Sequence, residues 1–96
     1  MNLAHTSHLR ACSEVLFSAA IEARWLAYQG ARDAQIADLM YAVHNIPHLM
    51  LDWDRCDVNL LRRILADYDT KWAGHGLCLN KTYDAALSEG DAGTPQ

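Results

Sequence analysis

The sequence has no closely spaced pair of cysteines. Its three cysteines, Cys12, Cys56 and Cys78, lie far apart, and an odd number without regular spacing is not typical of a disulfide-stabilised secreted domain. The first residues also lack the continuous apolar segment that follows a basic start in a signal peptide. We therefore expect reduced thiols and a cytoplasmic protein.

Long apolar runs and clusters of basic residues are missing as well. No run reaches the ~18 apolar residues of a membrane-spanning helix, so we predict no membrane association. The net charge is −4, the eight basic residues are scattered, and only Arg62 and Arg63 are adjacent. Because nonspecific affinity for nucleic acid comes from basic side chains, nucleic acid is an unfavourable partner. Neither a membrane nor a phosphate backbone is the expected target.

Motifs of the common enzyme classes are absent too. The sequence has no phosphate-binding loop, no nucleophile elbow, no HExxH zinc motif and no dinucleotide glycine fingerprint. The few glutamates, Glu14, Glu22 and Glu89, do not form the ExxH pairs of a di-iron bundle. We predict no cofactor, and a binding role is favoured over an enzyme.

Helical periodicity is the main positive signal, because no segment shows sustained strand alternation. The first helix is expected over residues 7–29, with Thr6 or Ser7 as its cap and Gly30 as the left-handed residue after its end. Residues of one helical stripe step by three or four along it: Leu9, Cys12, Leu16, Ala19, Ala23 and Leu26. This stripe predicts one face packed against the rest of the protein.

Two further helical segments are expected after this helix. The second begins near Asp33 and is broken at Pro47, since proline donates no backbone hydrogen bond and clashes with the preceding turn. That break would leave Ile46 extended and start a short helix that ends near residue 53. The third is expected to begin after Asp54 and to end before Gly74. Residues 78–87 could form one more short helix, with Asn80 as its cap.

These elements predict an all-α protein, a small antiparallel three-helix bundle whose middle arm is broken at Pro47. We assign residues 1–88 to a single helical domain. The polar, glycine-containing residues 89–96 are expected to form a flexible C-terminal tail.

A metal site is one alternative function. His5, His8 and Cys12 are spaced to share a helical face, and two imidazoles with a thiolate suit Zn²⁺ or copper. However, Cys12 falls on the apolar stripe, which favours a core cysteine beside two exposed histidines. This metal site remains the weaker alternative.

DNA binding is the second alternative. A helix-turn-helix could be drawn from residues 35–39, a turn near His44 and Asn45, and a second helix over residues 47–53. That second helix is short, apolar and acidic, whereas a recognition helix needs polar and basic side chains that reach base edges. The pattern therefore gives little support to a DNA-binding regulator.

An excess of large apolar residues is the feature that these alternatives leave unexplained. Apolar residues occupy much of the first helix, and large aromatic side chains are enriched where proteins bind one another. The predicted interface residues are Leu16, Trp25, Tyr28, Trp53 and Trp72. We therefore predict an interaction module that binds a protein partner or itself, with a homodimer as the favoured form.

Overall fold

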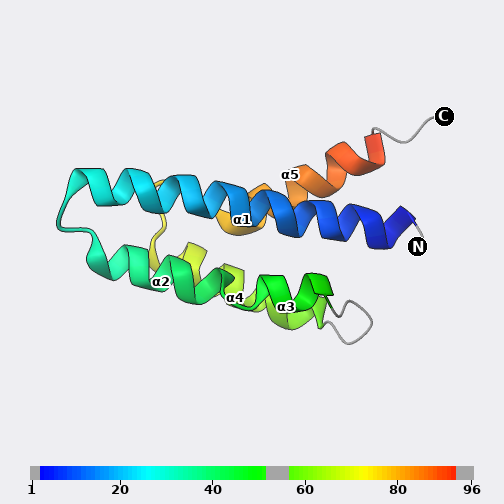
Figure 1. Ribbon diagram of the computed structural model, residues 1–96, viewed down its shortest axis with the longest axis horizontal. Helices are drawn as coiled ribbons and strands as arrows, with labels where there is room; N and C mark the ends of the chain where they lie inside the picture. Colours follow the sequence, from blue (N-terminus) through cyan, green and yellow to red (C-terminus); the bar gives the residue numbers. More distant parts are fainter. Residues whose placement is uncertain (1–2, 52–56, 93–96) are drawn as a thin grey trace.

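The computed structural model describes the backbone of residues 3–51 and 57–92, and the side chains of residues 6–51 and 57–89. Within these ranges the chain is all-helical, as predicted, and contains no strand. The helices are α1 (Leu3–Gln29), α2 (Asp33–Val43), α3 (Ile46–Leu51), α4 (Val58–Lys71) and α5 (Leu79–Ala92) (Figure 1).

The long helix α1 ends where the sequence predicted, at Gln29. Gly30 follows with φ of +76°, a left-handed conformation that costs glycine little because it has no Cβ. The start of α1 was predicted too late, because Thr6 and Ser7 lie inside the helix and do not cap it.

The break in the second segment lies before Pro47. Helix α2 ends at Val43, and α3 begins at Ile46, with Pro47 as its second residue. Proline is tolerated in a first helical turn, where its missing N–H would have no acceptor within the helix. The turn therefore falls at His44 and Asn45, and Ile46 is helical where the sequence analysis expected it to be extended.

The first turns of α4 and α5 are capped by aspartates that the sequence pattern did not single out as caps. The Asp57 carboxylate accepts the backbone N–H of Leu60 at 3.1 Å, so α4 is capped at Asp57; Asp54 lies outside the described residues. The Asp69 carboxylate accepts the N–H groups of Leu79 and Asn80 at 2.6 and 2.9 Å. This distant carboxylate satisfies the first N–H groups of α5, the role expected of Asn80.

Helix α5 is a full member of the bundle. It contacts α1 more extensively than any other helix does, and it runs back toward the beginning of α1, so the start of α1 and the end of α5 lie on the same side (Figure 1). It also extends to Ala92, into the range that we assigned to a flexible tail. The remaining contacts of α1 are chiefly with α2 and α3 on its other side.

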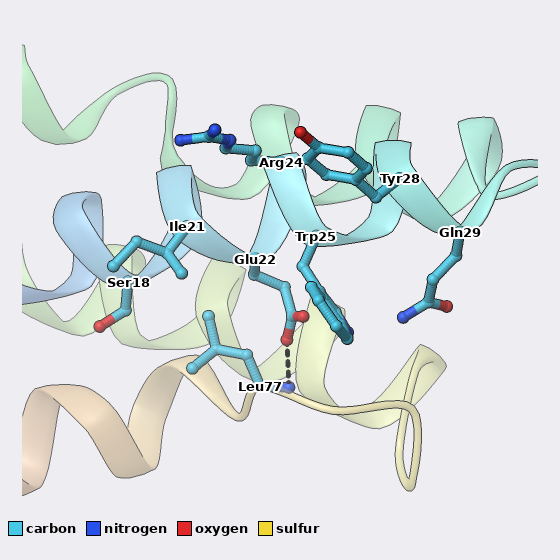
Figure 2. A pocket seen from close by; sticks show the side chains of 8 residues that line it. All are labelled: Ser18, Ile21, Glu22, Arg24, Trp25, Tyr28, Gln29 and Leu77. Atoms are coloured by element: carbon cyan, nitrogen blue, oxygen red, sulfur yellow. Dashed lines mark hydrogen bonds between the residues drawn. The ribbon is translucent and has the colours of Figure 1, made fainter.

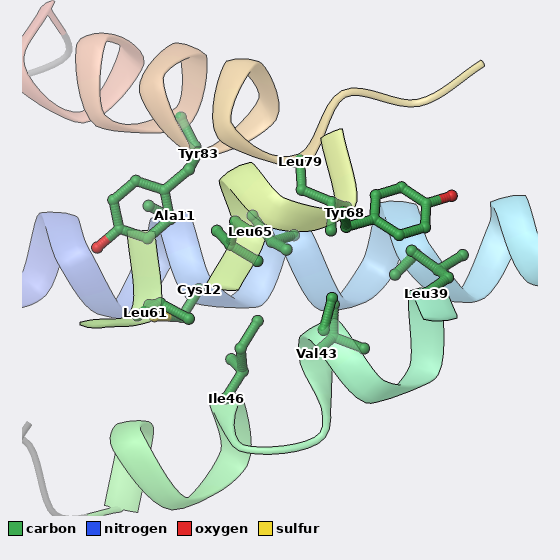
Figure 3. Close-up of a cluster of buried hydrophobic side chains, with 14 of the residues drawn as sticks. Ala11, Cys12, Leu39, Val43, Ile46, Leu61, Leu65, Tyr68, Leu79 and Tyr83 are labelled. Atoms are coloured by element: carbon green, nitrogen blue, oxygen red, sulfur yellow. The ribbon is translucent and has the colours of Figure 1, made fainter. Parts of the chain in front are cut away.

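The core lies between α1 and the other helices (Figure 3). The predicted stripe of α1 is correct in direction, but its most buried line is shifted toward Ala11 and Val15, which are both fully buried. Tyr83 of α5 is the largest fully buried side chain. The other buried apolar residues are Cys12, Ala19, Leu26, Leu39, Ala42, Val43, Ile46, Leu61, Leu65, Tyr68, Leu79 and Ala86.

Candidate functional site

The outer side of α1 carries four large apolar residues that remain exposed to solvent. Phe17, Ile21, Trp25 and Tyr28 are 66%, 56%, 62% and 75% exposed. Because they are spaced by four, four and three residues, their side chains project from one side of the helix. We call these four residues the apolar face.

The apolar face lies on the outer side of α1, and its C-terminal part also lies beyond the reach of α5, which is shorter than α1. Helix α1 has 27 residues and α5 has 14, which corresponds to about 40 and about 21 Å. Helix α5 covers the N-terminal half of α1, where the Tyr83 hydroxyl lies 2.7 Å from His8 Nδ1. Beyond the start of α5, the connection that leads into it touches α1 at Glu22, and the last turns of α1 extend past this contact.

A groove of about 820 Å³ opens beside the apolar face (Figure 2). Its lining residues are Ser18, Ile21, Glu22, Arg24, Trp25, Tyr28, Gln29 and Leu77. Ser18 lies seven residues after the buried Ala11, and Trp25 lies fourteen residues after it. Because residues seven apart fall on the same side of a helix, the groove lies on the side of α1 that α5 covers in the preceding turns. The groove therefore continues the track of α5 along α1.

A hydrogen bond between α1 and the α4–α5 connection holds the far wall of the groove. The Glu22 carboxylate accepts the backbone N–H of Leu77 at 2.7 Å (Figure 2). The neighbouring Gly76 has φ of +117°, and a Cβ added there would lie 2.8 Å from Glu22 Oε2. The backbone conformation therefore favours glycine at this position, and an added side chain would displace the Glu22 carboxylate.

The structure brings together two of the five predicted interface residues. Trp25 and Tyr28 belong to the apolar face and line the groove. Leu16 and Trp72 are partly buried against the core, so they are not part of this surface. Trp53 lies outside the described residues.

Trp72 has a structural role between α2 and α4. Its indole N–H donates to Asp38 at 2.9 Å, and Lys71 forms an ion pair with the same carboxylate at 2.7 Å. Hydrogen bonding to Lys71 and then to Trp72 lowers the pKa of Asp38, because both donors favour the ionised carboxylate. Trp72 therefore anchors the end of α4 to α2.

The residues of the alternative metal site are engaged in the bundle. His8 contacts Tyr83, and Cys12 is fully buried in the core. The side chain of His5 lies outside the described residues. In the part of the chain that the structure describes, no three His, Cys, Asp or Glu side chains are grouped to hold a metal ion.

Gln35, the first residue of the segment considered as a helix-turn-helix, has a structural role inside the bundle. Gln35 is buried and donates its amide N–H groups to the Tyr68 hydroxyl and the His75 carbonyl oxygen, at 3.2 and 3.1 Å. Burial raises the pKa of Tyr68 and outweighs the hydrogen bond from Gln35, which lowers it. Gln35 thus joins α2, α4 and the following connection. DNA binding has no further support from this segment.

Phe17 and Ile21 were not among the predicted interface residues. Their spacing relative to Trp25 and Tyr28 was a usable signal. No signal in the sequence pointed to Leu77 as part of the groove wall, because 55 residues separate Leu77 from Glu22.

No helix in the described ranges has both the length and the apolar character needed to cross a lipid bilayer. Comparisons with protein-family models, curated proteins and solved structures find no match to this chain. The apolar face is therefore interpreted from its own geometry.

Proposed function

We propose that this protein is a self-associating helical module that forms a homodimer through the apolar face of α1. The observation that carries this proposal is the exposure of four large apolar side chains, Phe17, Ile21, Trp25 and Tyr28, on one side of one helix. Aromatic residues of this kind dominate the binding energy of protein interfaces. The proposal keeps the cytoplasmic location expected from the cysteine pattern.

The area of the apolar face is sufficient for a small dimer interface. A large aromatic side chain buries roughly 150–250 Å² when fully covered, so the exposed parts of the four side chains amount to about 500 Å² per chain. Two copies would bury about 1,000 Å², which is near the lower limit for specific association. We therefore expect a weak dimer, in exchange with monomer.

Other exposed apolar residues do not form a comparable surface. Met40 and Tyr41 lie on α2, Leu51 ends α3, and Leu60 lies near the start of α4. Single exposed apolar residues are normal on soluble proteins, whereas a continuous group marks a binding site. Within the described residues, the face on α1 is the better candidate.

Sedimentation analysis over a concentration series tests this proposal. The wild-type chain should shift from monomer to dimer as its concentration rises. The double variant Trp25→Ser/Tyr28→Ser should remain monomeric over the same range, because it removes the two aromatic anchors.

A matched double variant, Tyr41→Ser/Leu51→Ser, controls for the loss of exposed apolar area, since these residues are 69% and 87% exposed on other helices. It should dimerise like the wild type, and circular dichroism should show the same helicity for all three proteins. A wild-type chain that stays monomeric throughout, or equal loss of dimer in both double variants, would contradict the proposal.

A further inference from the structure

We propose that the two α1 helices of the dimer pair antiparallel, so that Trp25 of each copy enters the groove beside Ser18 of the other. This inference rests on the proposed homodimer and assigns its geometry. It follows from the distribution of charge along α1 and from the side of the helix on which the groove lies.

The charges on the outer side of α1 disfavour a parallel pair. Arg10, Glu14 and Arg24 are exposed and lie on the same side of the helix as the apolar face. In a parallel symmetric pair each residue faces its own copy, so three like-charged contacts would form along the interface. Like charges at close range disfavour such a complex.

An antiparallel pair separates Arg10 and Glu14 from their own copies, so two of the three like-charged contacts are removed, and it keeps the apolar residues together. If the twofold axis passes near Glu22 and Ala23, Phe17 lies opposite Tyr28, and Ile21 lies opposite the stretch that contains Trp25. Glu14 of each copy then lies near the C-terminal end of α1 of the other copy, close to Arg32 of that copy.

Both Glu14 and Arg32 are exposed, and the described residues show neither in an ion pair within the chain. Opposite charges therefore meet across the proposed interface. The helix dipoles also oppose one another in this arrangement, which is favourable.

The position of the groove agrees with the same arrangement. In an antiparallel pair, residues on one flank of a helix meet the same flank of the partner helix. Ser18 and Trp25, seven residues apart, share the flank that borders the groove (Figure 2). Trp25 of each copy is therefore directed at Ser18 of the other, and the small serine leaves room for the indole. A parallel pair would direct Trp25 at the opposite flank.

The groove supplies what a buried indole requires. Ile21 and Leu77 provide apolar walls, and the partly buried Glu22 carboxylate provides an acceptor. One Glu22 oxygen already accepts the N–H of Leu77, and a carboxylate has capacity for further donors. A buried indole N–H usually has a hydrogen-bond partner, and Glu22 would accept the N–H of the incoming Trp25.

Distance measurement between spin labels tests the orientation and leaves the four residues of the apolar face unchanged. A single label is placed at residue 10 through Arg10→Cys in a Cys56→Ser/Cys78→Ser background, in which Cys12 is buried. Antiparallel pairing separates the two labels by about 25 residues of helix rise, so pulsed electron double resonance should give a distance of about 40 Å. A parallel pair would place them within about 25 Å of one another and would overturn the antiparallel assignment.

Sedimentation of the same labelled sample separates the two proposals. A monomer with no dipolar signal overturns the homodimer, whereas a dimer with a short label distance overturns only the orientation.

Ser18→Trp then tests the groove directly: it should weaken dimerisation at least about tenfold, because the new indole occupies the space of Trp25 from the other copy. The control Ser88→Trp, on the exposed surface of α5, should leave the dimer unchanged. Equal dimerisation by both variants would overturn insertion of Trp25 into the groove.

Discussion

The two halves of α1 have different surroundings, and the C-terminal half is the more apolar of the two. In the N-terminal half, Ala11, Cys12 and Val15 are fully buried, and α5 packs along the helix. In the C-terminal half, which extends past the start of α5 at Leu79, Leu26 is buried, but Trp25 and Tyr28 on the outer side are exposed. Burial along α1 therefore depends both on the reach of the neighbouring helix and on the side of α1 that a residue occupies. This uncovered half carries the face that we propose as a dimer interface.

A matched pair of tyrosine substitutions should give the largest contrast between the two halves. Tyr83 is fully buried between α5 and α1, whereas Tyr28 is 75% exposed. Tyr83→Ala should lower the free energy of unfolding by about 3–5 kcal/mol through lost packing, and Tyr28→Ala should change it by less than about 0.5 kcal/mol. Urea denaturation at low protein concentration measures both values. Similar losses in the two variants would remove the distinction between a covered and an uncovered half.

The contact between Glu22 and the α4–α5 connection marks the boundary of the covered half. Gly76→Ala introduces a left-handed alanine and a Cβ at 2.8 Å from Glu22 Oε2, so we expect a loss of about 2–3 kcal/mol. Gly74→Ala is the matched control, because Gly74 has φ of +80° but nothing lies within 4 Å of its added Cβ.

The control should lose only about 1 kcal/mol, the cost of the backbone conformation alone. The difference between the two variants in urea denaturation measures the strength of the Glu22 contact. If both variants lose the same amount, Glu22 does not hold the groove wall in place.

Alkaline pH should weaken the α2–α4 contact that supports the C-terminal half of α1 from the other side. Burial raises the pKa of Tyr68 above its ordinary value, so the folded state retains this proton when the unfolded chain has lost it. The resulting stability is present below about pH 10 and is lost as the pH rises from there through the folded pKa.

Thermal unfolding from pH 8 upward measures this loss, and Tyr68→Phe should show a smaller decline with pH than the wild type. Because the test compares how steeply stability declines with pH in the two proteins, it does not depend on the stability of the variant at neutral pH. Parallel declines in the two proteins would show that Tyr68 is not the titrating group.

Local sequence patterns predicted where the helices lie better than they predicted which helices pack against one another. The spacing of Cys12, Ala19 and Leu26 gave the buried direction of α1, and Gly30 gave its end, because both signals depend on neighbouring residues. The break near Pro47 was displaced, since proline is equally compatible with a first helical turn.

Long-range contacts explain most of what the sequence did not predict. The role of α5 depends on Tyr83 reaching α1 and on Asp69 capping Leu79, and neither contact has a spacing signature. For the interface, the surplus of aromatics pointed to Trp25 and Tyr28 but also to Trp72, which the bundle uses to bind Asp38. Composition can reveal an excess of apolar surface, but only the packing shows which residues remain uncovered.

A dilution series followed by amide chemical shifts tests the central claim most directly. As the concentration rises, we expect the amide signals of residues 14–32, which include the apolar face, to move together along one binding curve. Signals from α5, which covers the other half of α1, should stay constant. Concentration-dependent shifts centred on α2 and α3, or no shifts at all, would contradict the assignment of the uncovered half of α1 as the dimer interface.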